Sequence, residues 1–104
     1  MRSIKLSSVV ESLDELNWKK WVYLDVEQKI GAETPCLLLN PDEADLGADG
    51  FTPLAAEEAS MKEFLSVQDL RSIVANFKAG HESPSMDDLL SAIVYFYEKD
   101  AFKA

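Results

Sequence analysis

A stretch of thirty-two residues from Ile30 to Met61 contains no Lys or Arg, so the negative charge of this chain is concentrated in one part of it. Seven carboxylates give the stretch a local charge of −7, whereas the other seventy-two residues carry twelve acids against ten bases and contribute only −2. The seven are Glu33, Asp42, Glu43, Asp45, Asp49, Glu57 and Glu58. Such a concentrated field attracts basic partners and repels phosphates, so we expect neither nucleic acid nor a membrane as partner.

The composition is typical of one folded domain. A chain of 104 residues buries roughly 65% of the surface that its unfolded form exposes, which suffices for a hydrophobic core. A hydrophobic content of 47% fits that core, so we expect residues 1–104 to form a single acidic domain. Cys36 is the one cysteine and cannot form an intramolecular disulfide. The N-terminus lacks the apolar core of a signal peptide, and no apolar run approaches the roughly 20 residues of a membrane span. These features predict a cytoplasmic protein.

The residues before the acidic stretch predict one helix and two strands. Apolar residues recur at spacings of three and four between Ser3 and Leu16, which indicates an amphipathic helix. Aromatic and β-branched residues then predict a strand over 20–24, with Trp21 and Tyr23 on the opposite face to Val22. The apolar run 36–39 after Pro35 predicts a second strand covered on both faces.

The residues from Asn40 onward predict a loop, three helices and a strand. Asn-Pro and two glycines mark residues 40–50 as a loop, and Thr52 followed by Pro53 indicates the start of a short helix over 54–60. A third strand is expected over 61–65. Ser66 and Ser85 are suited to cap two longer helices, the first ending before Gly80 and the second near residue 99. The pattern predicts an α+β fold in which four helices cover a small sheet of about three strands.

The patterns that would indicate a metal site or an active site are incomplete. Asp45 to Ala56 begins like a calcium-binding EF-hand loop, but Gly47 stands at the third position and Ala56 where a bidentate Glu is needed. Cys36 lies in an apolar run and His81 in a polar loop, which argues against a thiol–imidazole pair. We therefore predict no catalytic residue, no metal ligand and no cofactor, and a protein that is not an enzyme.

The acidic stretch supplies the candidate partner-binding residues. The loop contributes Asp42, Glu43, Asp45 and Asp49, and the short helix that follows contributes Glu57 and Glu58. Phe51 lies in the most acidic region, where an apolar side chain is otherwise unexplained, so we predict that it anchors the partner. Trp18 and Trp21 flank the basic doublet at 19–20 and could either pack in the core or contact a partner.

Three segments carry a resemblance to a known class of protein. They are Trp18–Leu24 (WKKWVYL), Thr34–Asp42 (TPCLLLNPD) and Tyr95–Phe102 (YFYEKDAF). Together they resemble small acidic bacterial immunity proteins of the contact-dependent growth inhibition type. The resemblance implies a protein that binds and neutralises the toxin domain of a cognate effector, often a nuclease. It assigns no binding residue, because such immunity proteins differ widely in fold and interface.

The sequence thus leads to a preferred hypothesis and two rivals. The preferred hypothesis is a non-catalytic immunity protein that blocks the active site of a basic toxin domain, a nuclease, with its acidic surface. The first rival is an acidic adaptor or regulatory module that binds another basic protein. The second is an enzyme that uses carboxylates converging in a cleft.

Overall fold

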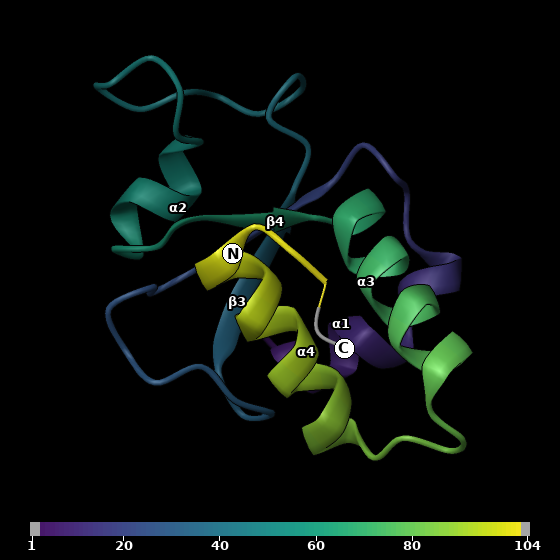
Figure 1. The fold of residues 1–104 in the computed structure, drawn as a ribbon. Coiled ribbons are helices and arrows are strands. Elements are labelled where there is room, and N and C mark those ends of the chain that lie inside the picture. The colour runs from purple at the N-terminus through teal and green to yellow at the C-terminus, as the bar shows by residue number, and fades with distance from the viewer. Residues whose placement is uncertain (1–2, 103–104) are drawn as a thin grey trace.

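The computed structural model describes residues 3–102 and has an α+β architecture (Figure 1). The elements in chain order are β1 (Ile4–Lys5), α1 (Leu6–Glu11), the 3-10 helix η1 (Leu13–Glu15), β2 (Trp21–Leu24), β3 (Pro35–Leu39), α2 (Leu54–Glu58), β4 (Lys62–Ser66), α3 (Val67–Gly80) and α4 (Met86–Lys99). Over the described residues the four strands form one antiparallel sheet in the order β1-β3-β2-β4. The prediction of an α+β fold with four α-helices is therefore confirmed, and the sheet has four strands rather than about three.

The strand register decides which loops lie together. Trp21 at the start of β2 pairs with Leu39 at the end of β3 and with Ser66 at the end of β4. The turn before β2, the acidic loop after β3 and the first turn of α3 therefore all emerge at one end of the strands. The connection between β2 and β3 and the start of β4 lie at the opposite end of the strands, where Leu24 pairs with Cys36 and Lys62.

The two faces of the sheet pack against different helices. Val22 and Leu24 point into a core cluster that α1, α3 and α4 complete, as the alternation along β2 predicted. Tyr23, on the other face, packs with Leu37 and Leu39 of β3 and with Ala56 of α2. Figure 1 shows α2 lying apart from the group that α1, α3 and α4 form. Strand β3 is thus covered on both faces, as expected.

The caps of the two long helices follow the sequence signals. The Ser66 hydroxyl accepts a hydrogen bond from the backbone N–H of Asp69 at 3.0 Å. Ser85 and Asp88 form a reciprocal capping box, each side chain accepting from the other's backbone N–H. Gly80 was predicted to follow α3 but is its last residue, and His81 takes the C-cap position.

The predicted helix over residues 3–16 is wrong at both ends. Ile4 and Lys5 instead form β1 and pair with Cys36 and Pro35, and the backbone N–H of Leu6 donates to the carbonyl of Thr34 at 2.9 Å. Sheet pairing thus outweighs the local helical preference at this end. After Glu11 the chain tightens into the 3-10 helix η1, so α1 is only six residues long.

Candidate functional site

The acidic loop between β3 and α2 is built as a small hairpin. Leu46 and Pro53 form an antiparallel bridge. The backbone N–H of Gly47 donates to the carbonyl of Thr52 at 2.7 Å, and the N–H of Leu54 donates to the carbonyl of Asp45 at 2.7 Å. Residues 46–53, called the 46–53 hairpin below, are therefore closed into a hairpin by backbone hydrogen bonds. The sequence predicted a loop here and did not predict this pairing.

Asp49 holds the tip of the 46–53 hairpin. One carboxylate oxygen accepts from the backbone N–H groups of Phe51 and Thr52 at 2.9 and 2.8 Å, and the other accepts from the Thr52 hydroxyl at 2.6 Å. These hydrogen bonds, with the Thr52 hydroxyl first among them, lower the pKa of the Asp49 carboxyl. Thr52 was predicted to cap the following helix. Its hydroxyl is used in the hairpin instead, and Pro53 takes the N-cap position of α2 without a side-chain cap.

Glu57 also turns back onto the 46–53 hairpin. Its Oε2 atom accepts a hydrogen bond from the backbone N–H of Ala48 at 3.1 Å. The carboxylate lies directly against Gly47, where a Cβ atom would overlap it. Glu57 was predicted to face outward from the helix as a partner contact, and the structure uses its carboxylate to join α2 to the hairpin.

Three of the predicted contact residues line one hollow, called the acidic hollow below. Glu43 and Asp45 come from the loop and Glu58 from α2, and all three side chains are exposed. The hollow is lined by Leu39, Glu43, Ala44, Asp45, Pro53, Leu54, Ala55 and Glu58. Apolar side chains thus form much of its lining, and three acidic residues share it with them. The register and the start of α2 bring the three acids together, although fifteen positions separate Glu43 from Glu58 along the chain.

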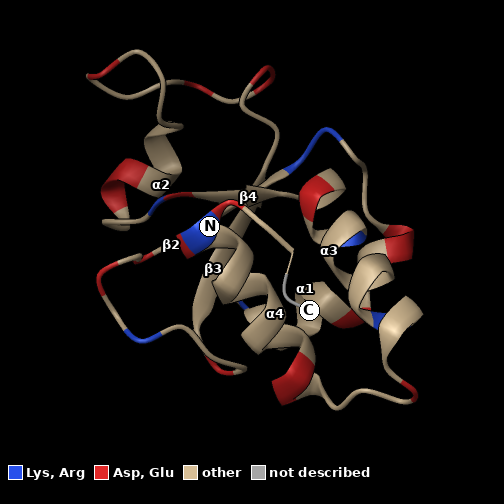
Figure 2. Cartoon of the chain, in the orientation of Figure 1, with Lys and Arg blue, Asp and Glu red and all other residues tan. Residues whose placement is uncertain are grey.

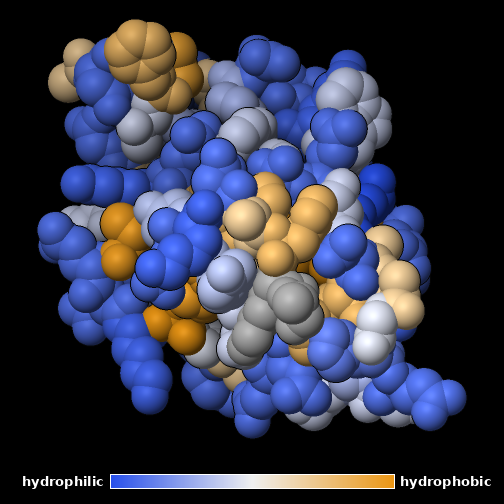
Figure 3. Space-filling model, viewed as in Figure 1, coloured by the Kyte–Doolittle hydropathy of each residue, from blue (hydrophilic) through white to orange (hydrophobic). Residues whose placement is uncertain are grey.

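The remaining predicted residues lie around the acidic hollow. Asp42 is exposed on the turn after β3, where its N–H donates to the Asn40 side chain at 3.0 Å. Phe51 sits at the hairpin tip with 83% of its surface exposed. Leu46 at the start of the hairpin and Leu54 directly after it are 46% and 40% exposed. Figure 3 shows an isolated group of hydrophobic side chains at the upper left, over the loop that precedes α2, with hydrophilic side chains around it.

The carboxylates of the loop and α2 are not neutralised by ion pairs. Within the described range 3–102, none of these six side chains forms an ion pair with Lys or Arg. Glu33, the seventh acid of the stretch, lies in the connection between β2 and β3 and pairs with Lys5 at 2.9 Å. Figure 2 shows acidic segments on α2 and on the two loop tips beside it. Of the seven acids of the stretch, Glu33 is therefore the one whose charge is paired within the described residues.

A basic turn lies at the same end of the strands as the acidic loop. Lys19 and Lys20 precede β2, and Figure 2 shows this blue segment near the acidic loop. Lys19 places its ammonium 5.7 Å from the ring centre of Trp18, whose side chain is 55% exposed. Trp21 is half-buried and packs against the cluster under α2. Of the two roles that the sequence left open, core packing is therefore observed for Trp21, and a contact between Trp18 and a partner stays a prediction.

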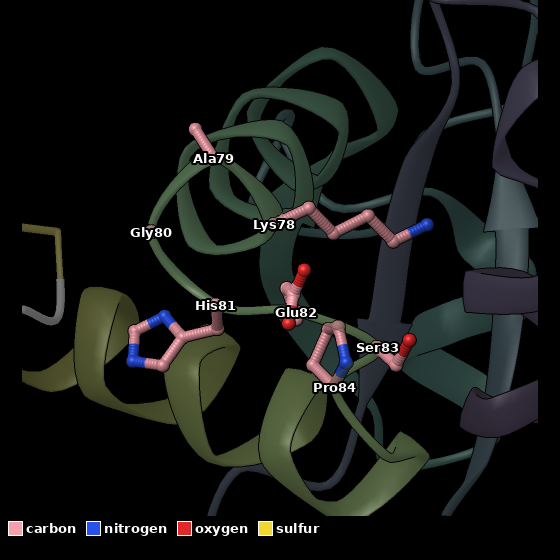
Figure 4. A pocket seen from close by; sticks show the side chains of 7 residues that line it. All are labelled: Lys78, Ala79, Gly80, His81, Glu82, Ser83 and Pro84. Atoms are coloured by element: carbon pink, nitrogen blue, oxygen red, sulfur yellow. The ribbon is translucent and has the colours of Figure 1, made fainter.

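The cysteine and the histidine have separate structural roles. Cys36 is fully buried, its thiol donates to the carbonyl of Ile4 at 3.3 Å, and burial raises its pKa to about 12. His81 stacks on Phe77 with 3.9 Å between ring centres, and its Nδ1 lies 3.0 Å from the Phe77 carbonyl oxygen. Figure 4 shows the open depression at this turn, in which His81 and Lys78 point in opposite directions. The depression does not bring reactive groups together.

Two searches of the described residues bear on other classes of function. In the part of the chain that the structure describes, no group of three or more His, Cys, Asp or Glu side chains could hold a metal ion. The carboxylates of the acidic hollow are thus not grouped as ligands of one cation. None of the helices between residues 3 and 102 has the length and apolar character needed to cross a bilayer.

Comparison with known proteins gives a family and no activity. No curated protein and no solved structure matches the chain. Residues 3–103 match the family described as "Domain of unknown function (DUF7716)", which covers nearly the whole chain. The chain therefore belongs to the DUF7716 family.

Proposed function

We propose that this protein is a non-catalytic immunity protein that binds a basic toxin domain, a nuclease, and blocks its active site with the acidic end of the molecule. The acidic hollow carries the proposal. Glu43, Asp45 and Glu58 line the hollow together with apolar side chains, and no Lys or Arg of the described chain pairs with them. This arrangement suits a Lys or Arg side chain of the partner, because such side chains combine an apolar stem with a cationic head.

The exposed tip of the 46–53 hairpin supports the same proposal. Phe51 is the most exposed of the large hydrophobic residues in the described chain, and it belongs to the stretch of residues 30–61 that contains seven acids and no Lys or Arg. Large apolar side chains that enter a partner's pocket supply most of the residence time of a complex, whereas complementary charge mainly raises the association rate. The acidic hollow would therefore raise the association rate, and the hairpin tip would lengthen the residence time of the complex.

The proposed mechanism is competition for a cationic site. A nuclease holds phosphates with Lys and Arg side chains, so its active site attracts anions. The carboxylates of the acidic hollow, next to a hairpin closed by backbone hydrogen bonds, would occupy that field without the entropy cost of ordering a loop. Substrate would then be excluded while the immunity protein stays bound.

Affinity capture from the native host tests the proposal. We expect the wild-type protein to retain a basic partner whose purified domain cleaves nucleic acid, and we expect added protein to abolish that cleavage. The variant Glu43→Gln/Asp45→Asn/Glu58→Gln should associate with this domain roughly tenfold or more slowly at low salt, because steering by charge can raise association rates by several orders of magnitude. Its salt dependence should be correspondingly flatter.

A second triple variant controls for net charge. Asp14→Asn/Glu15→Gln/Glu82→Gln removes the same three charges from exposed positions on η1 and on the α3–α4 turn. It should associate nearly as fast as the wild type. Equal slowing by both triple variants would move the interface away from the acidic hollow. A captured basic protein whose activity is unaffected would support the adaptor function and contradict the immunity function.

A further inference from the structure

We propose that Glu57 is a positioning residue that locks the 46–53 hairpin onto α2 in the free protein, and that it does not contact the partner through its charge. Its carboxylate reaches across the hairpin to the backbone N–H of Ala48 at 3.1 Å. The link joins two segments nine residues apart, one on the helix and one near the hairpin tip. The geometry stands without any partner, and only its consequence for binding rests on the proposed function.

Gly47 makes this link possible. A Cβ atom at position 47 would overlap Oε2 of Glu57, so only glycine lets the carboxylate lie against the hairpin backbone. Gly47 does not have a positive φ, whereas Gly50 has a φ of 75°. An alanine at position 47 therefore meets the Glu57 carboxylate and no backbone strain of the left-handed kind. The flexible end of the Glu57 side chain can move away, which would break the link and leave the fold intact.

Glu57 and Glu58 are neighbours in sequence but act in different places. Glu58 lines the acidic hollow, whereas the Glu57 carboxylate is directed at Gly47 and Ala48. Adjacent residues of a helix point in directions about 100° apart, which separates the two carboxylates. The pair therefore offers a matched comparison, because each truncation removes one exposed negative charge from the same helix.

Amide hydrogen exchange of the full-length protein without a partner tests the lock. Glu57→Ala should speed exchange of the Ala48 amide by roughly fivefold, because its acceptor is lost, and amides at the hairpin tip should follow. Glu57→Gln keeps a carbonyl acceptor and should stay within roughly twofold of the wild type. Glu58→Ala should leave the Ala48 amide unchanged.

Gly47→Ala should reproduce the effect of Glu57→Ala, and combining the two substitutions should add nothing further, because both remove the same hydrogen bond. Unchanged Ala48 exchange in both single variants would overturn the lock. If the effects of the two substitutions on the exchange rate add up in the double variant, the lock is also overturned, because Gly47 would then act independently of Glu57.

Binding of the purified partner distinguishes this inference from the proposed function. Glu57→Gln should associate as the wild type does, although it lacks the charge, whereas Glu57→Ala should associate more slowly. Equal defects in both variants would make Glu57 a charge contact and overturn its positioning role. If the exchange results hold but no basic toxin domain is bound, the lock stands and the immunity function fails.

Discussion

The two faces of the sheet are stabilised in different ways. The face covered by α1, α3 and α4 buries a continuous apolar cluster, with Leu6, Leu70 and Ile93 almost inaccessible to solvent. The face covered by α2 buries only a small group around Tyr23, Leu37, Leu39 and Ala56. The 46–53 hairpin beyond it is held by hydrogen bonds and leaves Phe51 in solvent.

This difference separates stability from surface chemistry. Apolar burial contributes about 1.5–3 kcal/mol for each fully buried large side chain, so the helical face supplies most of the free energy of folding. The hairpin side is free to carry carboxylates and exposed apolar groups that a hydrophobic core would not tolerate. Substitutions on the two sides should therefore affect different measurements.

Truncation in the helical core should have the largest effect on stability. Leu70 is fully buried on α3, and Leu70→Ala would leave a cavity that the packed helices cannot fill. We expect the free energy of unfolding to fall by about 2–5 kcal/mol, measured by urea denaturation at pH 7. A loss below about 1 kcal/mol would contradict the assignment of the main stabilising core to this face.

Alkaline pH should lower the free energy of unfolding through two titrating groups, one on each face of the sheet. Burial raises the pKa of Cys36, on the helical face, from 9.0 to about 12. Burial, together with the nearby Glu63 carboxylate, raises the pKa of Tyr23, on the α2 face, from 10.0 to about 12. The unfolded chain loses these protons first, so stability should be complete below pH 9 and fall progressively toward pH 12.

Two substitutions separate these contributions. Tyr23→Phe and Cys36→Ala each remove one titrating group, and the free energy of unfolding measured between pH 7 and 11 should decline less steeply in each variant. In the double variant, the free energy of unfolding should decline with pH less steeply than in either single variant. A double variant that declines as steeply as the wild type would assign the alkaline loss to other groups.

A smaller effect is expected at the start of α4. Ser85→Ala removes one half of the capping box with Asp88, so the first turn of the helix loses a hydrogen bond to its backbone. We expect a loss of about 1 kcal/mol, or roughly 4–8 °C in the melting temperature. Ser85→Asp keeps an acceptor at the cap and should recover most of this loss. An unchanged melting temperature in the alanine variant would show that tertiary packing alone fixes this helix.

The elements predicted from sequence are those whose signals are local. Ser66 and Ser85 precede clear apolar periodicities, and both helices start where these caps indicate. The strands β2, β3 and β4 likewise coincide with short runs that contain apolar or aromatic residues. Strand β1 was missed because Ile4 and Lys5 become a strand only through pairing with Cys36 and Pro35, some thirty residues away.

The candidate site was predicted in composition but not in arrangement. The charge pattern identified Glu43, Asp45 and Glu58, yet their common position around one hollow depends on the register of β3 and the path of α2. The Asp49-Gly50 pair was a turn signal and could have indicated a hairpin. No local sequence signal distinguished the role of Glu57 from that of Glu58. The Glu57 carboxylate can lie against the hairpin because Gly47, ten residues earlier, has no Cβ atom.

The smallest expected effect on stability belongs to Phe51, and it gives the sharpest contrast between the two sides of the molecule. With 83% of its surface exposed, the side chain contributes little burial, so Phe51→Ala should change the free energy of unfolding by less than about 0.5 kcal/mol. Binding to the partner should nevertheless weaken roughly 30-fold, as expected when an interface anchor is truncated. Phe102→Ala, at an exposed position in the C-terminal segment, is the matched control and should not weaken binding. If both variants bind normally, the exposed apolar tip is not an anchor, and the acidic hollow must hold the partner without it.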